Sequence, residues 1–579
     1  MHKAALMNKF SDTILQQIME FQYDRNTAGL LKFADHRNGA YRMQVAKAFA
    51  SVQDTLAITK LAGLLKDKDP AIRVAAAFAL GQTAHVNGAE FLYLQFLKEK
   101  NNLVKKQMLE AIGKCGDEKA LQRIIELDIP YGNDDVLDGK AMAFARFSIN
   151  GVFNKAALEE VIKIIGSKKI SGRVKYSASI ALTRMPLELS DLQLEMLISA
   201  FQLERSLNTK LNIVLAAGKN KSKKSKAFLI SVFENSEDYR LRINALSSLT
   251  KFDYKLVYEA YYTALYDSSI NVAIRASEYF LQNGQGKDAG EYYNYSNKTD
   301  NWRVVANLLT AAIKYSDDKE RFSELIINKF NVSQNNYEKA WLLKALGGDL
   351  SNLKFVKDEV LSTEVAIIRS MGIEALSAMR AHNEFEEYYK EYKLTENRDL
   401  NDEFARIFKE AILSGDVALI SIASTAIRNP KFKLKNYYEN TAFLDSAQAN
   451  CKLPKQIEAY LELQKVIDFI NETKTAQMPE FNYKELNWSQ IVKIKADQKI
   501  EVISSKGNFT IQLNVEDNPA TVATFIELIN RGFYKNKYIH RVVPNFVIQD
   551  GCRRGDGWGS PGFSIRSECY NSYYQEGSV

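Results

Sequence analysis

Residues 67–81 read Asp-Lys-Asp-Pro-Ala-Ile-Arg-Val-Ala-Ala-Ala-Phe-Ala-Leu-Gly, and this stretch decides the fold of most of the chain. Asp69 is placed to cap a helix that begins at Pro70, where the missing backbone N–H needs no partner. Gly81 is placed to end that helix. The apolar residues fall at offsets that share one helix face: Ile72, Ala75, Ala76, Ala79 and Leu80. The stretch therefore predicts an amphipathic helix with small residues on its buried face.

The same pattern recurs between about residues 10 and 430. Its copies start near residues 41, 72, 104, 141, 174, 211, 241, 272, 305, 337, 368 and 404. These starts are 30 to 37 residues apart, which is long enough for two helices and their turns, so the period predicts a solenoid of helical pairs. The pattern resembles a HEAT-type repeat. Tetratricopeptide repeats have a similar period, but their Trp-Leu-Gly-Tyr pattern is not found here.

A solenoid of this kind usually offers an extended concave surface to a protein or peptide. We therefore expect a protein partner on the solenoid surface, and the alternative is an array that serves only as a spacer or scaffold. Residues 1–430 contain no glycine-rich phosphate loop, no paired acid motif and no nucleophile elbow. The array is thus expected to bind and not to catalyse.

The composition excludes several classes of function. The chain is 46% hydrophobic and 25% charged, which is typical of soluble globular proteins. Its 579 residues are too many for one hydrophobic core. The net charge of +7 is small. The densest lysine cluster, residues 219–226, is interpreted as a solvated loop between helices, with a site for an anionic partner as the alternative. No nucleic-acid partner is therefore expected.

The cysteines and histidines indicate no metal site. Four cysteines show no Cys-x-x-Cys spacing, and the five histidines are scattered, so neither a metal nor a cofactor is expected. No apolar run reaches the roughly 18 residues of a transmembrane span. The apolar patch Ala4–Met7 is too short for a signal peptide. The chain as given is expected in the cytoplasm, with the periplasm or cell envelope as the alternative if a signal sequence lies upstream.

A joining segment follows the repeats. Asn429-Pro430 and Leu453-Pro454 mark breaks, and a helix is expected between Pro454 and Thr473 as a cap on the array. Residues 474–486 are interpreted as a linker. The predicted domains are a HEAT-like α-solenoid over 1–430, a capping helix and linker over 431–497, and a third domain over 498–579.

From about residue 498 the apolar period changes from 3.6 to 2. Apolar residues alternate on both sides of the turn Lys506-Gly507-Asn508, which predicts a β-hairpin. The alternating residues are Ile500, Val502, Phe509, Ile511 and Leu513. A helix is expected next, between Pro519 and Gly532, with Val522, Phe525, Ile526 and Ile529 on one face.

Residues 538–551 then read Tyr-Ile-His-Arg-Val-Val-Pro-Asn-Phe-Val-Ile-Gln-Asp-Gly. Together with other motifs in order along the chain, this stretch resembles the cyclophilin family of peptidyl-prolyl cis–trans isomerases. The other motifs are Lys506-Gly507-x-Phe509, Pro519-x-Thr521-Val522-x-x-Phe525, Gly532-Phe533-Tyr534, Arg554-Gly555-Asp556-Gly557-x-Gly559 and Ile565-Arg566-x-Glu568.

Isomerisation of a prolyl bond is limited by a barrier of about 18–20 kcal/mol that comes from amide resonance. Catalysis needs an apolar pocket for the proline ring and a donor that stabilises the twisted amide, and arginine suits the second task. The resemblance implies that Arg541 and Gln549 are catalytic, with Arg541 as the donor and Gln549 orienting it and the substrate backbone. It implies that Phe546 and Val547 bind substrate, with Phe546 as the floor of the proline pocket. Many family members have methionine at the position of Val547.

The resemblance also implies a fold and a reaction. The family fold is a closed eight-stranded barrel with two helices, of which residues 498–579 would be the first half. The expected fold class is therefore multidomain, an all-α HEAT-like solenoid followed by a partial, mainly β cyclophilin-like barrel that is truncated at its C-terminus. The expected function is a peptidyl-prolyl cis–trans isomerase acting in protein folding, on proline-containing peptides or unfolded proteins that the array binds. The alternative is a non-catalytic HEAT-repeat scaffold with an inactive isomerase segment.

Overall fold

The computed structural model describes residues 7–390, 399–475, 479, 483–572, 574 and 577–579. By the packing of its residues the chain divides into two units. Unit 1 comprises Met1–Phe252, Glu485–Arg531 and Ile565–Val579, and unit 2 comprises Asp253–Lys484 and Gly532–Ser564. These units are defined by packing, and the boundaries predicted at residues 430 and 497 stay predictions. Residues 476–478 and 480–482 of the predicted linker lie outside the described residues.

Unit 1 contains the first half of the repeats and two later helices. Its α-helices are α1 Thr13–Tyr23, α2 Thr27–Leu31, α3 Gly39–Val52, α4 Ile58–Leu64, α5 Pro70–Gln82, α6 Val86–Phe96, α7 Asn102–Cys115, α8 Glu118–Ile125, α9 Asp134–Ile149, α10 Lys155–Gly166, α11 Gly172–Arg184, α12 Asp191–Leu203, α13 Leu207–Ala217, α14 Lys223–Asn235, α15 Tyr239–Leu249, α29 Trp488–Ile491 and α30 Pro519–Asn530. Its strands are β1 Lys499–Val502 and β2 Phe509–Gln512.

Unit 2 continues the repeats and contains the second hairpin. Its α-helices are α16 Tyr254–Ala264, α17 Ile270–Asn283, α18 Ala289–Ser296, α19 Trp302–Tyr315, α20 Lys319–Val332, α21 Asn336–Ala345, α22 Leu353–Ser362, α23 Ala366–Ala381, α24 Phe385–Tyr388, α25 Leu400–Leu413, α26 Val417–Ile427, α27 Ala442–Ala449 and α28 Ile457–Asn471. Its strands are β3 Arg541–Val543 and β4 Val547–Gln549.

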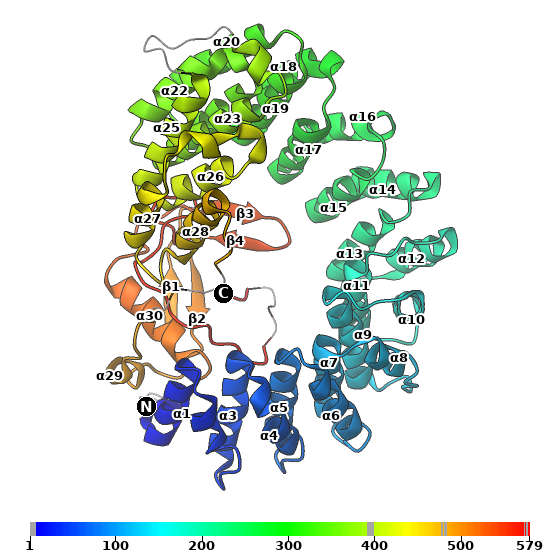
Figure 1. Ribbon diagram of the computed structural model, residues 1–579. Helices are drawn as coiled ribbons and strands as arrows, with labels where there is room; N and C mark the ends of the chain where they lie inside the picture. The colour runs from blue at the N-terminus through cyan, green and yellow to red at the C-terminus, as the bar shows by residue number, and fades with distance from the viewer. Residues whose placement is uncertain (1–6, 391–398, 476–478, 480–482, 573, 575–576) are drawn as a thin grey trace. The chain divides into compact units, whose positions relative to one another are not determined.

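The predicted solenoid of helical pairs is confirmed. Every predicted repeat start lies in a helix, in the odd-numbered series from α3 to α25. Within unit 1 the helices α3, α5, α7, α9, α11, α13 and α15 each pack on the next, and Figure 1 shows them in one row with α4, α6, α8, α10, α12 and α14 beside it. Within unit 2 the helices α17, α19, α21 and α23 likewise each pack on the next. Each repeat therefore buries its apolar face against its neighbour.

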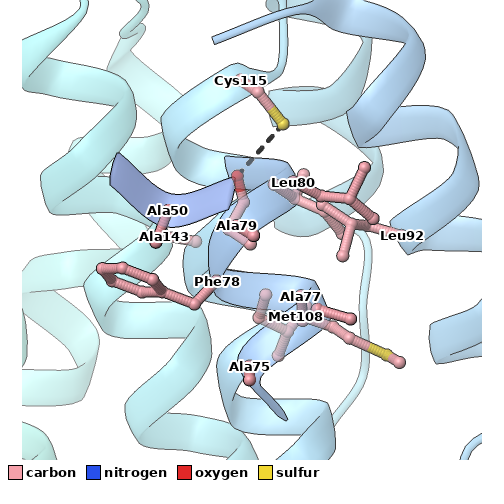
Figure 2. Packing of buried hydrophobic residues seen from close by; sticks show 14 of the residues in the cluster. Ala50, Ala75, Ala77, Phe78, Ala79, Leu80, Leu92, Met108, Cys115 and Ala143 are labelled. Atoms are coloured by element: carbon pink, nitrogen blue, oxygen red, sulfur yellow. Dashed lines mark hydrogen bonds between the residues drawn. The ribbon is translucent and has the colours of Figure 1, made fainter. Parts of the chain in front are cut away.

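Helix α5 shows why the repeat sequence folds this way. The Asp69 carboxylate accepts a hydrogen bond from the backbone N–H of Ala71 at 2.8 Å, and Pro70 occupies the first turn. The predicted apolar face is buried. Figure 2 shows the alanines of α5 among side chains from α3, α6, α7 and α9. The small residues let these helices approach closely.

Gly81 has a different role from the predicted one. Helix α5 continues through Gln82 and is capped at Thr83, so Gly81 does not end it. A Cβ atom at Gly81 would lie 2.9 Å from the Cα atom of Ala111 in α7. The glycine therefore permits the close approach of two consecutive repeats, a tertiary contact that the local sequence does not reveal.

The arginine of the repeat pattern ties one repeat to the next. Arg73 donates from Nη1 to the carbonyl oxygen of Asp67 at 2.8 Å and pairs through Nε with the Glu99 carboxylate at 2.8 Å. In the preceding repeat, Arg42 pairs through Nε with the Asp67 carboxylate at 2.6 Å. The bond from Arg42 is the main reason that the pKa of the Asp67 carboxyl lies below its ordinary value. The turns between repeats are thereby fixed.

The C-terminal elements confirm the predicted hairpin and helix. Strands β1 and β2 pair antiparallel with Ile500 opposite Ile511 and Val502 opposite Phe509. Strands β3 and β4 form a second two-stranded sheet that is separate from the first. The described part of the chain contains no closed barrel, as expected for a partial domain. In unit 2, α28 packs against α26 and α27.

The region around β1, β2 and α30 shares a core with the first repeats. Buried side chains of this region belong to the same apolar cluster as those of α1 to α13: Ile491, Ile494, Leu513, Val515, Val522 and Ala523. The amide of Asn8, which is 2% exposed, donates to the carbonyl oxygens of Ile491 and Ile494 at 2.8 and 2.7 Å. Residues 485–531 thus cover the first helices of the array within unit 1.

Candidate functional site

The β3–β4 hairpin carries the four residues that the sequence singles out. Arg541 lies opposite Gln549, and Val543 lies opposite Val547, in the antiparallel register. The turn between the strands includes Asn545 at φ +63°, and the backbone N–H of Phe546 donates to the carbonyl oxygen of Val543 at 3.1 Å. Directly opposite residues of an antiparallel pair project to the same face. The register therefore places Arg541, Val543, Val547 and Gln549 on one face of the hairpin.

Arg541 and Gln549 meet in the structure. Nη1 of Arg541 donates to Oε1 of Gln549 at 3.3 Å, and both side chains are exposed. A guanidinium has five donors in a fixed fork, so this contact leaves other N–H groups of Arg541 directed to solvent or to a ligand. The pair has the composition that stabilisation of a twisted amide requires.

Phe546 and Val547 lie at the turn end of the hairpin. The Phe546 side chain is 76% exposed, whereas Val547 is half-buried. On the opposite face of the hairpin, Val542 and Ile548 are 50% and 58% exposed. The structure brings Arg541 and Gln549 together, whereas Phe546 lies in the turn with its side chain largely exposed. The role of Phe546 as the floor of a proline pocket stays a prediction.

The glycine-rich loop after β4 is closed by its own polar groups. The Asp556 carboxylate, which is 1% exposed, accepts hydrogen bonds from the backbone N–H of Trp558 and from Nε of Arg554, both at 2.9 Å. The buried Cys552 thiol accepts a hydrogen bond from the backbone N–H of Gly559 at 3.1 Å. These contacts close the loop that directly follows the hairpin.

This loop also packs on repeat helices of unit 2. Nη1 of Arg554 pairs with the Asp416 carboxylate at 2.6 Å, and Asp416 itself caps α26. The hydroxyl of Tyr337 in α21 donates to the carbonyl oxygen of Gly555. The rings of Tyr337 and Tyr538 meet edge to face with centroids 6.5 Å apart. Sequence reasoning missed Tyr337 and Asp416, because their partners lie more than a hundred residues away and no local pattern marks them.

Glu568 lies in unit 1, not at the hairpin. Its carboxylate accepts hydrogen bonds from the backbone N–H groups of Ala520 and Thr521 at 3.0 and 2.9 Å, at the start of α30. Burial raises the pKa of this carboxyl above its ordinary value, although the hydrogen bonds act in the opposite direction. Glu568 therefore has a structural contact here that caps a helix.

Two further properties of the described residues bear on the site. No group of three or more His, Cys, Asp or Glu side chains among them could hold a metal ion. Within the same residues, no helix is both long and apolar enough to cross a membrane.

Comparison with known proteins gives one match for residues 499–576, the family described as cyclophilin type peptidyl-prolyl cis-trans isomerase/CLD. A peptidyl-prolyl cis-trans isomerase of Synechococcus elongatus is 38% identical over 76 residues, which are 13% of this chain and 52% of that protein. Peptidyl-prolyl cis-trans isomerase B of Bacillus subtilis is 49% identical over 57 residues, 10% of this chain and 40% of that protein. The chain thus spans about half the length of the curated relatives it matches.

Among solved structures, importin beta in an ammonium sulfate condition is similar over 79% of this chain and 69% of its own, with 11% identity and a TM-score of 0.47. The helical-repeat fold follows from the packing of this chain's own helices. The order of elements, the motifs and the family match agree for the C-terminal part: residues 499–576 are a partial cyclophilin-type domain, which this chain carries after a HEAT-like helical array.

Proposed function

We propose that this protein catalyses cis–trans isomerisation of prolyl peptide bonds in polypeptides that its helical array helps to bind. The Arg541–Gln549 contact at 3.3 Å carries the proposal, because it places a charged, multivalent donor on one face of an exposed hairpin. In the proposed reaction a guanidinium N–H donates to the substrate as the amide twists and loses conjugation. That interaction is stronger in the transition state than in the ground state, which is the condition for catalysis.

No covalent intermediate is needed in this mechanism. The reaction rotates one C–N bond and transfers no group, so the site has only to bind the proline ring and to stabilise the twisted amide. Gln549 would hold the Arg541 side chain in position and contact the substrate backbone. Phe546 and Val547, at the turn end of the same hairpin, would contact the proline ring.

The test is proline isomerisation in a short chromogenic peptide and in refolding of a proline-limited protein, with the full chain and its Arg541→Ala variant. Loss of most of the rate enhancement in Arg541→Ala, with Arg541→Lys in between, would support the proposal. Arg553→Ala is a matched control, because Arg553 is another exposed arginine of unit 2 and stacks on the Phe533 ring. Equal rates for the wild type and Arg541→Ala would exclude Arg541 as the catalytic donor.

A second candidate function is a binding scaffold without catalysis. It is favoured by the shared core of unit 1, in which apolar side chains of residues 485–531 pack with the first repeat helices. In this candidate the isomerase-type segment serves as a structural cover for the array. Absence of rate enhancement by the wild type, with binding of unfolded polypeptide retained, would favour it.

A further inference from the structure

Three aromatic rings from two consecutive repeats form one surface in unit 2. Tyr337 and Trp341 are four residues apart on α21 and so share a helix face. Trp302 begins the neighbouring helix α19. Its ring centroid lies 6.0 Å from that of Tyr337 in a stacked arrangement and 5.7 Å from that of Trp341 in an edge-to-face arrangement. We call Trp302, Tyr337 and Trp341 the aromatic face.

The aromatic face is accessible and has hydrogen-bond donors to offer. All three side chains are half-buried and not part of the apolar core. Among the described residues, neither the Trp302 nor the Trp341 indole N–H has a protein acceptor, and neither is a buried unpaired atom. A buried Trp N–H usually finds an acceptor within the protein, whereas these two indole N–H groups are open. They can therefore donate to a ligand that has free carbonyl groups beside the exposed ring surface.

The aromatic face continues to the candidate site through Tyr538. This residue is 70% exposed, and its ring packs against the Tyr337 ring in an edge-to-face arrangement. Tyr538 precedes Arg541 by three residues, a span of at most about 11 Å of extended chain. The Tyr337–Gly555 hydrogen bond holds the loop after β4 against α21, and the Arg554–Asp416 ion pair holds it at the start of α26. An extended peptide could therefore contact Arg541 and the aromatic face at once.

The chemistry of the face fits one class of ligand. An extended segment that contains proline has no internal backbone hydrogen bonds, so its carbonyl groups remain free as acceptors. Proline rings pack on aromatic surfaces, and such segments bind to surfaces lined by tryptophan and tyrosine. We propose that Trp302, Tyr337 and Trp341, continued by Tyr538, bind the residues that flank the target proline in an extended polypeptide. This inference adds a binding surface to the proposed function. It rests on that function only for the claim that the bound segment contains the prolyl bond that is isomerised.

The test measures binding apart from catalysis. The full chain is titrated with a twelve-residue peptide that contains two prolines in an extended sequence, and with the same peptide in which alanine replaces proline. Intrinsic tryptophan fluorescence and calorimetry report the affinity. We expect saturable binding of the proline peptide and binding at least about tenfold weaker in Trp341→Ala and Tyr538→Ala, since aromatic anchors contribute most to such interfaces. Tyr538→Ala is the safer variant for folding because its side chain is 70% exposed.

Tyr266→Ala is the matched control, because Tyr266 is an exposed aromatic residue of unit 2 on another repeat, and it should bind normally. Unchanged affinity in both Trp341→Ala and Tyr538→Ala would overturn the inference. Equal binding of the alanine peptide, or preferential binding of an oligothymidine, would overturn it as well. If the wild type binds the proline peptide through Trp341 but shows no isomerase activity, the binding inference is supported. The proposed catalysis is then contradicted.

Discussion

The hydroxyl group of Ser51 forms two hydrogen bonds with the backbone of Cys569. It accepts from the Cys569 N–H at 2.8 Å and donates to the Cys569 carbonyl oxygen at 3.3 Å. Ser51 lies in α3 and is 6% exposed, whereas Cys569 lies in the C-terminal part of unit 1, outside helix and strand. One buried hydroxyl thus satisfies both polar groups of a residue that has no secondary-structure partner.

Ser51→Ala should release this segment from α3. Loss of the hydroxyl leaves the Cys569 N–H and C=O without their partner, which typically destabilises by about 1–3 kcal/mol. We expect faster reaction of the Cys569 thiol with a labelling reagent and faster exchange of its amide hydrogen. Ser414→Ala in unit 2 is the control for loss of a serine hydroxyl, and an unchanged labelling rate in Ser51→Ala would contradict the prediction.

Gly81→Ala should destabilise unit 1. The new Cβ atom would lie 2.9 Å from the Cα of Ala111, so α5 and α7 would have to separate. Overpacking of this kind usually costs about 1–3 kcal/mol. Gly63→Ala is the matched control, because Gly63 also lies in a helix and an added Cβ there meets nothing within 4 Å. Urea unfolding should show a lower free energy of unfolding for Gly81→Ala. For Gly63→Ala it should show a free energy of unfolding that is unchanged or higher by up to about 1 kcal/mol.

Glu568 should give unit 1 a specific dependence on pH. Burial raises the pKa of its carboxyl above the ordinary value of 4.5, so the folded state holds this proton at pH values where the unfolded chain has lost it. Its contribution to the free energy of unfolding is therefore fully present below pH of about 4.5 and falls as the pH rises through the raised pKa. The unfolding free energy of the wild type minus that of Glu568→Gln should therefore decrease as the pH rises from about 4.5 through the raised pKa. A difference that increases with pH would mean that the bonds from Ala520 and Thr521 outweigh burial.

Gln549→Ala should reduce the proposed isomerase activity less than Arg541→Ala does. The variant removes the 3.3 Å contact that orients the guanidinium but keeps the guanidinium itself. Loss of one positioning hydrogen bond, worth about 1 kcal/mol, corresponds to a decrease in kcat of about fivefold. Steady-state kinetics on a short prolyl peptide would measure it. A loss in Gln549→Ala as large as that in Arg541→Ala would assign Gln549 a direct role in the reaction.

Arg554 and Asp416 should be energetically coupled. Their side chains are 22% and 23% exposed, and the Asp416 carboxylate also caps α26. Asp416→Asn keeps the cap and removes the charge, so a double-mutant cycle with Arg554→Ala isolates the ion pair. We expect a coupling of about 1 kcal/mol, near the upper end for partly exposed pairs and weaker at high salt. Additive effects of the two substitutions would mean that the loop is held mainly by Tyr337.

Local patterns predicted the secondary structure of this chain closely. Each repeat start lies in a helix, the hairpin around residues 506–508 is present, and so is the helix after Pro519. The reason is that apolar period and capping residues act over a few residues of sequence. Gly81 was misinterpreted because a glycine near a helix end and a glycine in a close helix contact look alike in one sequence.

The sequence by itself determined the repeat period, the family of residues 499–576 and the identity of Arg541 and Gln549 as candidate site residues. Only the tertiary structure decided what surrounds them. The aromatic face beside Tyr538, the ion pair of Arg554 with Asp416 and the shared core of residues 485–531 with the first repeats all join residues that are far apart along the chain. Such contacts depend on which helix faces meet in three dimensions, and a local sequence pattern specifies that a face is apolar without specifying its partner.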